Sequence, residues 1–250
     1  MIIYNVSGGI ARITLNRPEK RNALSPELIT ALTDAFTQSA KDQAVRVVLV
    51  TGAGQDFCSG MDLASLERTA EAGVLNHLES ARNLADLFLA IRHHPRPVVA
   101  AVKGRALAGG CGLATACDLI LAAESAQFAY TEVKIGFVPA IVMAILRRSV
   151  SEKRAFELIA SGEAITAVEA RSIGVINRVY PDAEFEASVE GYVASLAEKS
   201  ASAVGLGKNL LYHTDGMTFE AAIEAGVHGN ALARMTEDAL RGIERFVKKS

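Results

Sequence analysis

The chain has 250 residues, half of them hydrophobic, and a formal net charge of −2 at pH 7. This length and composition suit one α/β domain with a small appendage, and the balanced charge lacks the basic excess of a nucleic-acid-binding protein. No stretch approaches the ~20 apolar residues that span a bilayer, and the N-terminus has no basic signal segment, so we expect a cytoplasmic protein without nucleic-acid or membrane partners.

The cysteines and histidines indicate neither disulfides nor a metal centre. Cys58, Cys111 and Cys117 are an odd count within apolar or glycine-rich segments, which is typical of reduced, buried thiols in a cytoplasmic protein. The five histidines show no metal-ligand spacing. We therefore expect no metal site.

The first half of the chain alternates short apolar runs with helical patterns. Residues 2–6 and 10–15 predict a hairpin joined by Ser7-Gly8-Gly9, and Ser25 before Pro26 predicts a capped helix to about residue 40. The later runs predict strands at 45–51, 98–102 and 118–123 and helices at 74–92 and 110–117. Such alternation implies parallel strands with right-handed crossovers.

The second half is mainly helical. Its periodic patterns predict helices at 140–149, 151–161, 166–173, 182–199, 202–215, 219–232 and 236–248, with one strand at 175–180. A helical C-terminal part of this kind cannot bury all its apolar faces alone, which suggests contacts between subunits.

Two small-residue segments each follow a strand-like run and open a helical one. They are Asp56–Leu63 and Gly104–Gly112. Glycine allows close backbone approach and positive φ, and a helix start leaves unpaired N–H groups. Each segment alone is more often a packing feature. Brought together, the two turns could aim two backbone donors at one oxygen, as in an oxyanion hole.

Four segments in fixed order resemble the crotonase (enoyl-CoA hydratase/isomerase) superfamily. They are Ile13–Leu24, Phe57–Leu63, Ala106–Asp118 and Thr131–Pro139. The resemblance runs from about residue 2 to the C-terminus. It implies an α/β fold with a ββα spiral core and CoA site over 1–195, and a helical trimerisation region over 196–250. It also implies a homotrimer or a hexamer, an acyl-CoA thioester as substrate, and no cofactor, because CoA enters with the substrate.

The resemblance assigns the catalytic groups. It implies that the backbone N–H groups of Met61 and Gly109 are the oxyanion donors and that Glu132 transfers protons beside the thioester's α and β carbons. Composition alone would favour a surface carboxylate paired with Lys134. At the family's position the carboxyl would be partly desolvated, which would raise its pKa and suit it to acid–base work.

The resemblance also assigns substrate contacts. Those to CoA are Lys20, Arg21, Ala23, Asp62, Leu63, Phe246 and Lys249. Solvated loop charges explain Lys20 and Arg21 equally well, and a basic C-terminal helix end is common for dipole reasons. The expected acyl pocket is apolar, as any core is, and comprises Met61, Leu66, Val74, Leu75, Leu78, Leu107, Phe137, Ile141 and Val142.

One position departs from the two-carboxylate hydratases: Gly112 stands where those enzymes carry a second Glu. A single acid is also what the family's Δ3,Δ2-enoyl-CoA isomerases use. However, Gly112 together with 131–141 looks like the methylglutaconyl-CoA hydratase branch, which also keeps one Glu. The leading hypothesis is a hydratase-type lyase that adds or removes water across the 2,3 double bond through an enolate. The alternatives are a single-Glu isomerase and an inactive CoA-binding scaffold.

Overall fold

A six-stranded sheet with the order β1-β2-β3-β4-β6-β9 forms the centre of the molecule. The structure, a computed structural model, describes residues 1–69 and 71–248. The strands of this sheet are β1 (Ile2–Ser7), β2 (Ile10–Leu15), β3 (Val47–Gly52), β4 (Val98–Val102), β6 (Leu119–Ala123) and β9 (Arg178–Tyr180).

Strand pairing follows the pattern that the sequence predicts. β1 and β2 form the predicted antiparallel hairpin, whose turn uses positive φ angles at Gly8 (59°) and Gly9 (77°). Every other neighbouring pair in this sheet is parallel, which confirms the crossover connections expected from alternating strands and helices.

A second, smaller sheet was not predicted. It has the order β5-β7-β8 and comprises β5 (Arg105–Leu107), β7 (Gln127–Ala129) and β8 (Ile165–Thr166). Strands of two or three residues are too short to show a period of two. This sheet matters for function because β5 leads directly into the second glycine-rich turn.

The predicted helices are present, with boundaries that match or differ by a few residues. In the first part of the chain they are α1 (Pro26–Lys41), α3 (Val74–Arg92), α4 (Gly109–Ala116), α5 (Ala140–Ser149), α6 (Glu152–Ser161) and α7 (Ala167–Ser172). The short helix α2 (Leu63–Arg68) was not predicted. The last four are α8 (Phe185–Ala197), α9 (Ala201–His213), α10 (Phe219–Arg234) and α11 (Glu237–Val247). Short 3-10 turns occur at Pro18–Lys20, Thr131–Ile135 and Asp182–Glu184.

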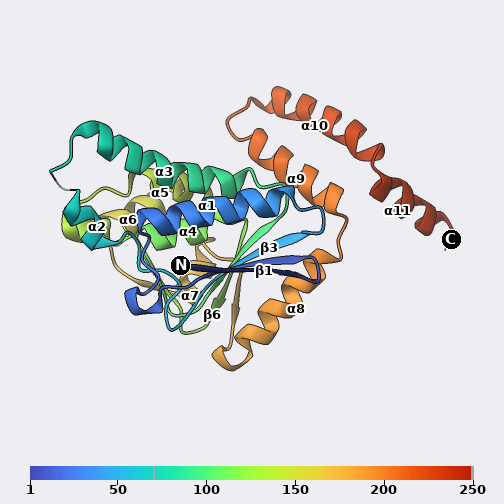
Figure 1. Cartoon of the computed structure of the whole chain (residues 1–250). Helices are drawn as coiled ribbons and strands as arrows, with labels where there is room; N and C mark the ends of the chain where they lie inside the picture. Colours follow the sequence, from blue (N-terminus) through green and yellow to red (C-terminus); the bar gives the residue numbers. More distant parts are fainter. Residues whose placement is uncertain (70, 249–250) are drawn as a thin grey trace.

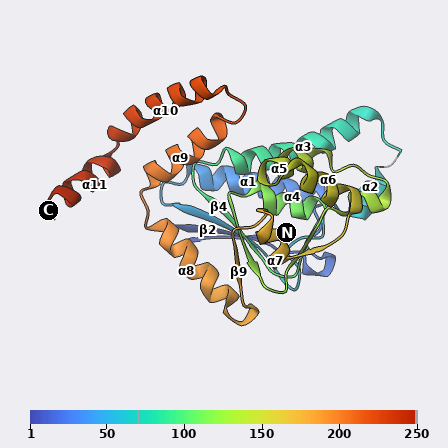
Figure 2. The same cartoon turned by 180° about the vertical axis from the view of Figure 1, so that it is seen from behind.

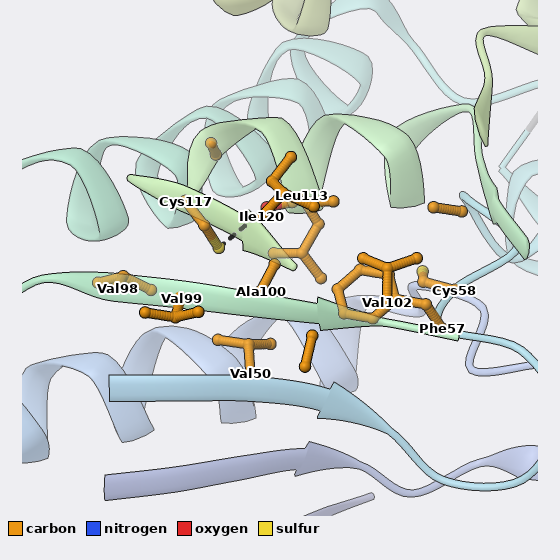
Figure 3. Close-up of a cluster of buried hydrophobic side chains, with 14 of the residues drawn as sticks. Val50, Phe57, Cys58, Val98, Val99, Ala100, Val102, Leu113, Cys117 and Ile120 are labelled. Atoms are coloured by element: carbon orange, nitrogen blue, oxygen red, sulfur yellow. Dashed lines mark hydrogen bonds between the residues drawn. The ribbon is translucent and has the colours of Figure 1, made fainter. Parts of the chain in front are cut away.

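Helices cover both faces of the large sheet (Figure 1). α1, α3 and α4 lie on one face and α8 lies on the other. The core between β4, β6 and α4 is built from aliphatic side chains such as Val99, Leu113 and Ile120 (Figure 3). Cys58, Cys111 and Cys117 are buried and unpaired, as predicted, and burial raises the pKa of the Cys58 and Cys111 thiols to about 12.

The three C-terminal helices α9, α10 and α11 extend away from the sheet (Figures 1 and 2). The boundary expected between residues 195 and 196 falls near the end of α8, which itself packs on the sheet. No helix within the described residues has the length and hydropathy needed to cross a membrane.

Candidate active site

The two glycine-rich segments lie side by side. Cys58 pairs with Ala106 in a parallel bridge, in which Cys58 N–H donates to Arg105 O (3.1 Å) and Leu107 N–H donates to Cys58 O (2.9 Å). The approach requires glycine, because a Cβ on Gly110 would lie 2.3 Å from the Cys58 carbonyl oxygen. The two predicted strand-to-helix turns are therefore held side by side by backbone hydrogen bonds.

Leu24 holds the chain on both sides of Met61. Leu24 N–H donates to Gly60 O (2.7 Å), and Asp62 N–H donates to Leu24 O (3.0 Å). Since backbone groups alternate in direction along an extended segment, the Met61 N–H points away from Leu24. A Cβ placed on Gly109 would lie 3.8 Å from the Met61 nitrogen, so the two residues are close neighbours.

Neither the Met61 N–H nor the Gly109 N–H has a hydrogen-bond acceptor among the residues that the structure describes. Gly109 is the first residue of α4, where N–H groups have no partner within the helix. We call these two groups the N–H pair. Two adjacent unclaimed donors, one at a helix start, are suited to a negatively charged oxygen.

Glu132 is a buried carboxyl group in the 3-10 turn Thr131–Ile135, which ends at Gly136 with a φ of 71°. The residue is 9% exposed, and its Oε2 has no hydrogen-bond partner among the described residues. Desolvation by burial raises the pKa of Glu132 above its ordinary value. The reading of Glu132 as a surface residue paired with Lys134 is wrong, because Lys134 is exposed and no ion pair joins the two in the described chain.

The surroundings of Glu132 connect it to α4. Burial is the largest cause of the raised pKa of Cys111, which lies two residues beyond Gly109 in α4. The negative charge of Glu132 raises the same pKa further. The other buried carboxylate among the described residues is Asp56, which Arg105 binds through two oxygens at 2.8 Å each. Glu132 is therefore the buried carboxylate left unpaired, which marks it as a functional candidate.

The space beside Gly112 is filled by apolar side chains. A Cβ on Gly112 would lie 2.1 Å from Val142 Cγ1 and 3.3 Å from Phe88 Cζ. Val142 comes from α5 and Phe88 from α3, and both are buried. This part of the site therefore lacks a second carboxylate and has no room for one.

The loop expected to contact CoA is fixed by Arg17, which the sequence analysis missed. Arg17 Nη1 donates to the Ala23 carbonyl (2.8 Å), and its Nη2 pairs with Asp62 Oδ2 (3.0 Å). Asp62 also caps α2 through Ser65 N–H (3.3 Å). The Ala23 carbonyl also accepts from Ser25 N–H (3.1 Å), so both of its lone pairs are engaged within the chain. Lys20, Arg21 and Leu63 are all exposed, Leu63 to 61%. Neither Lys20 nor Arg21 forms an ion pair in the described chain.

Asn22 is a second residue that sequence reasoning missed. It is fully buried at a φ of 55°. Its Nδ2 donates to Ala53 O (2.9 Å) and Asp56 O (2.8 Å), and its Oδ1 accepts from Arg17 N–H (2.9 Å). It thereby joins the CoA-side loop to the segment that leads into Met61. The one sequence signal was that Asn tolerates a left-handed backbone.

The residues expected to line the acyl pocket differ in exposure. Leu66, Leu107 and Ile141 are half-buried, whereas Phe137 is 57% exposed. Leu75 and Leu78 of α3, also expected to line the acyl pocket, are 75% and 61% exposed. α11, which carries Phe246, lies on the opposite side of the molecule from α2 (Figures 1 and 2). Lys249 lies outside the described residues.

A cavity of about 740 Å³ between the end of α3 and α9 is separate from these groups. Its Lys208 ammonium donates to Ile91 O (3.0 Å) and Arg96 O (3.2 Å) and pairs with Asp118 (2.8 Å). All three of its protons are therefore engaged, and the cavity offers no free cation from Lys208. Within the described residues, no group of three or more His, Cys, Asp or Glu side chains could hold a metal ion.

Comparisons with known proteins agree with this geometry. The family model described as enoyl-CoA hydratase/isomerase matches residues 5–250. A Thermus thermophilus protein, which its name places among the enoyl-CoA hydratases, is 40% identical over 242 residues, covering 97% of this chain and 96% of the relative.

Solved structures match equally well. The crystal structure of an enoyl-CoA hydratase from Mycobacterium smegmatis is 34% identical with a TM-score of 0.95, covering 99% of this chain and 96% of that one. Human enoyl-CoA hydratase domain-containing protein 3 is 31% identical with a TM-score of 0.94, covering 99% and 97%. The α/β fold expected from the sequence motifs is confirmed, and the chain is an enzyme of the enoyl-CoA hydratase/isomerase family.

Proposed function

We propose that this enzyme adds or removes water across the 2,3 double bond of an enoyl-CoA thioester. Two observations support the proposal. One is the buried Glu132 carboxyl, which lacks a hydrogen-bond partner in the described chain and whose charge acts on Cys111 in α4. The other is the pair of unclaimed backbone donors, the N–H pair of Met61 and Gly109. The thioester oxygen accepts hydrogen bonds from the N–H pair, which stabilises the charge that develops on that oxygen.

Hydration then needs one base that later serves as an acid. The Glu132 carboxylate removes a proton from water while the water oxygen bonds to C3, and the electrons of the double bond move to the thioester oxygen to give an enolate. The Glu132 carboxylic acid then protonates C2, and the thioester carbonyl re-forms. A raised pKa favours the first step, because it makes the Glu132 carboxylate a stronger base toward the water proton.

A second candidate is Δ3,Δ2-enoyl-CoA isomerisation, which the apolar filling beside Gly112 favours. In that reaction Glu132 removes a proton from C2 and returns it to C4, so no water has to be held. Gly112 stands where the hydratases with two acids carry a second carboxylate, and the apolar Val142 and Phe88 fill the space beside it, which suits a reaction without a bound water.

The remaining assignments belong to the same proposal. Lys20, Arg21 and Ala23 bind CoA along the loop that precedes α1, beside Asp62 and Leu63. Phe246 and Lys249 reach CoA from a neighbouring subunit of a cytoplasmic homotrimer or hexamer. Leu66, Leu107, Phe137 and Ile141 line the acyl group, and no cofactor besides the substrate's CoA takes part.

The test follows the conjugated enoyl-thioester absorbance with crotonyl-CoA, 3-methylglutaconyl-CoA and a 3-enoyl-CoA. Falling absorbance with either of the first two means hydration, and rising absorbance with the third alone means isomerisation. The Glu132→Gln variant should lose at least about a hundredfold in kcat while binding acyl-CoA as the wild type does. If the wild type is inactive on all three substrates, or if Glu132→Gln retains full activity, the proposal fails.

A further inference from the structure

Ala108 has a backbone conformation that alanine rarely adopts. Its φ is 47° and its ψ is −125°, and it lies between the end of β5 and the first residue of α4. An L-residue with a side chain is strained there, whereas glycine is not. Strain of this kind persists where the surrounding structure enforces it, and it concentrates at functional sites.

The neighbouring structure does enforce it. Ala108 N–H donates to Ala129 O on β7 (2.7 Å), and Ala108 O accepts from Gly112 N–H in the first turn of α4 (3.0 Å). With both groups fixed, the negative ψ turns the Ala108–Gly109 peptide away from its direction in a strand. This peptide carries the Gly109 N–H, one member of the N–H pair.

The methyl group of Ala108 lies between the two loops that supply the N–H pair. A Cβ on Gly60 would lie 2.9 Å from Ala108 Cβ and 3.4 Å from the Gly109 nitrogen. Gly60 directly precedes Met61 and has a φ of 94°. The methyl therefore contacts the Met61 loop at the point where it passes the start of α4.

We propose that Ala108 is a positioning residue of the N–H pair: its strained peptide aims the Gly109 N–H, and its methyl sets the spacing of the two donors. The proposal rests on the proposed function, in which the pair binds the thioester oxygen. Ala108 itself touches no reacting atom. Replacing it with glycine should relieve strain and loosen the pair at once.

The experiment compares Ala108→Gly with Ala106→Gly. Ala106 is a fully buried residue of β5 whose φ is not positive, so the same change there removes only packing and chain stiffness. We expect Ala108→Gly to raise Tm by about 2 to 4 °C, and Ala106→Gly to lower it. Opposite signs would separate relieved strain from lost packing.

The functional measurement uses acetoacetyl-CoA, whose enolate has its own ultraviolet absorbance and needs no turnover. The wild type should lower the pKa of the bound ligand's α-carbon acid. Ala108→Gly should weaken this enolate stabilisation by at least about tenfold while changing affinity for CoA itself less than twofold. Ala106→Gly should retain wild-type enolate stabilisation.

Two outcomes overturn the inference alone. One is an Ala108→Gly variant that stabilises the enolate as well as the wild type does, and the other is a Tm that falls as in Ala106→Gly. If the wild type binds CoA but leaves the enolate absorbance unchanged, the proposed function fails first, and the inference fails with it.

Discussion

Glu132 is 9% exposed, and one of its carboxylate oxygens lacks a hydrogen-bond partner in the part of the chain that the structure describes. A structural carboxylate at this depth would be paired, as Asp56 is with Arg105. Burial raises the pKa of Glu132, so the folded protein holds this proton more tightly than the unfolded chain does. The Glu132 carboxyl is therefore suited to proton transfer. When it is charged, it lowers the free energy of unfolding of the protein.

Glu132→Gln should stabilise the folded protein at high pH. Above the folded-state pKa the carboxylate is charged in both states, and only the folded state bears its desolvation. Below about pH 4 it is protonated in both states, and the difference disappears. Thermal unfolding from pH 4 to pH 8 should show the Tm advantage of the variant growing with pH. The exposed Glu163→Gln is the control, and equal Tm values for Glu132→Gln and wild type at pH 8 would contradict the argument.

The sequence shows residue types but not residue environments. Met61, Gly109 and Glu132 were singled out because their segments carry a recognisable order of motifs, and their catalytic roles stay predictions. Asn22 and Ala108 could not be singled out, because one depends on complete burial and the other on a positive φ, and neither property follows from residue type. Arg17 was missed because its partners, Ala23 and Asp62, come together only in the folded chain.

Among the secondary-structure elements, length decided what could be predicted. α3 and α5 were predicted at their observed boundaries, since helices of 19 and 10 residues show a clear period. The short strands β5, β7 and β8 gave no period, although β5 is what brings Leu107 beside Cys58. The packing of α4 on α5 was also hidden, because the close approach at Gly112 depends on Val142 from a later helix.

Gly112→Ala tests that packing. Alanine normally stabilises a helix interior relative to glycine by about 0.5–1 kcal/mol, but here its Cβ overlaps Val142 Cγ1. We expect a loss of about 1–3 kcal/mol in urea unfolding. Gly191→Ala, in an exposed part of α8 with open space around it, should stabilise.

The double variant Gly112→Ala/Val142→Ala should lose less unfolding free energy than the two single variants lose together, by more than about 0.5 kcal/mol. This expectation holds because shortening Val142 removes the overlapping Cγ1 atom. A Gly112→Ala variant as stable as the wild type would show that α4 and α5 are not closely packed.

For the whole molecule, the C-terminal helices leave apolar surface unburied. In α10, Phe219, Ile223 and Val227 are 76%, 55% and 55% exposed. In α11, Leu240 and Ile243 are each 58% exposed and lie at helical spacing. Asp238 fixes the start of α11 to α9 through the Ser200 and Ser202 hydroxyls at 2.8 and 2.9 Å. The predicted unburied faces are therefore present on an anchored helix, as contacts between subunits require.

Ile243→Glu should weaken assembly if this face of α11 joins subunits. A charge at an apolar contact must be desolvated without a partner, so the variant should dissociate at micromolar concentration. Light scattering after size-exclusion chromatography should give the wild type a mass of three or six chains of 26.5 kDa and give Ile243→Glu the mass of one chain. Arg245→Glu places the same residue at an exposed polar position of the helix and should assemble as the wild type does. A wild type that elutes as a monomer, or an Ile243→Glu variant with wild-type mass, would show that α11 does not join subunits through this face.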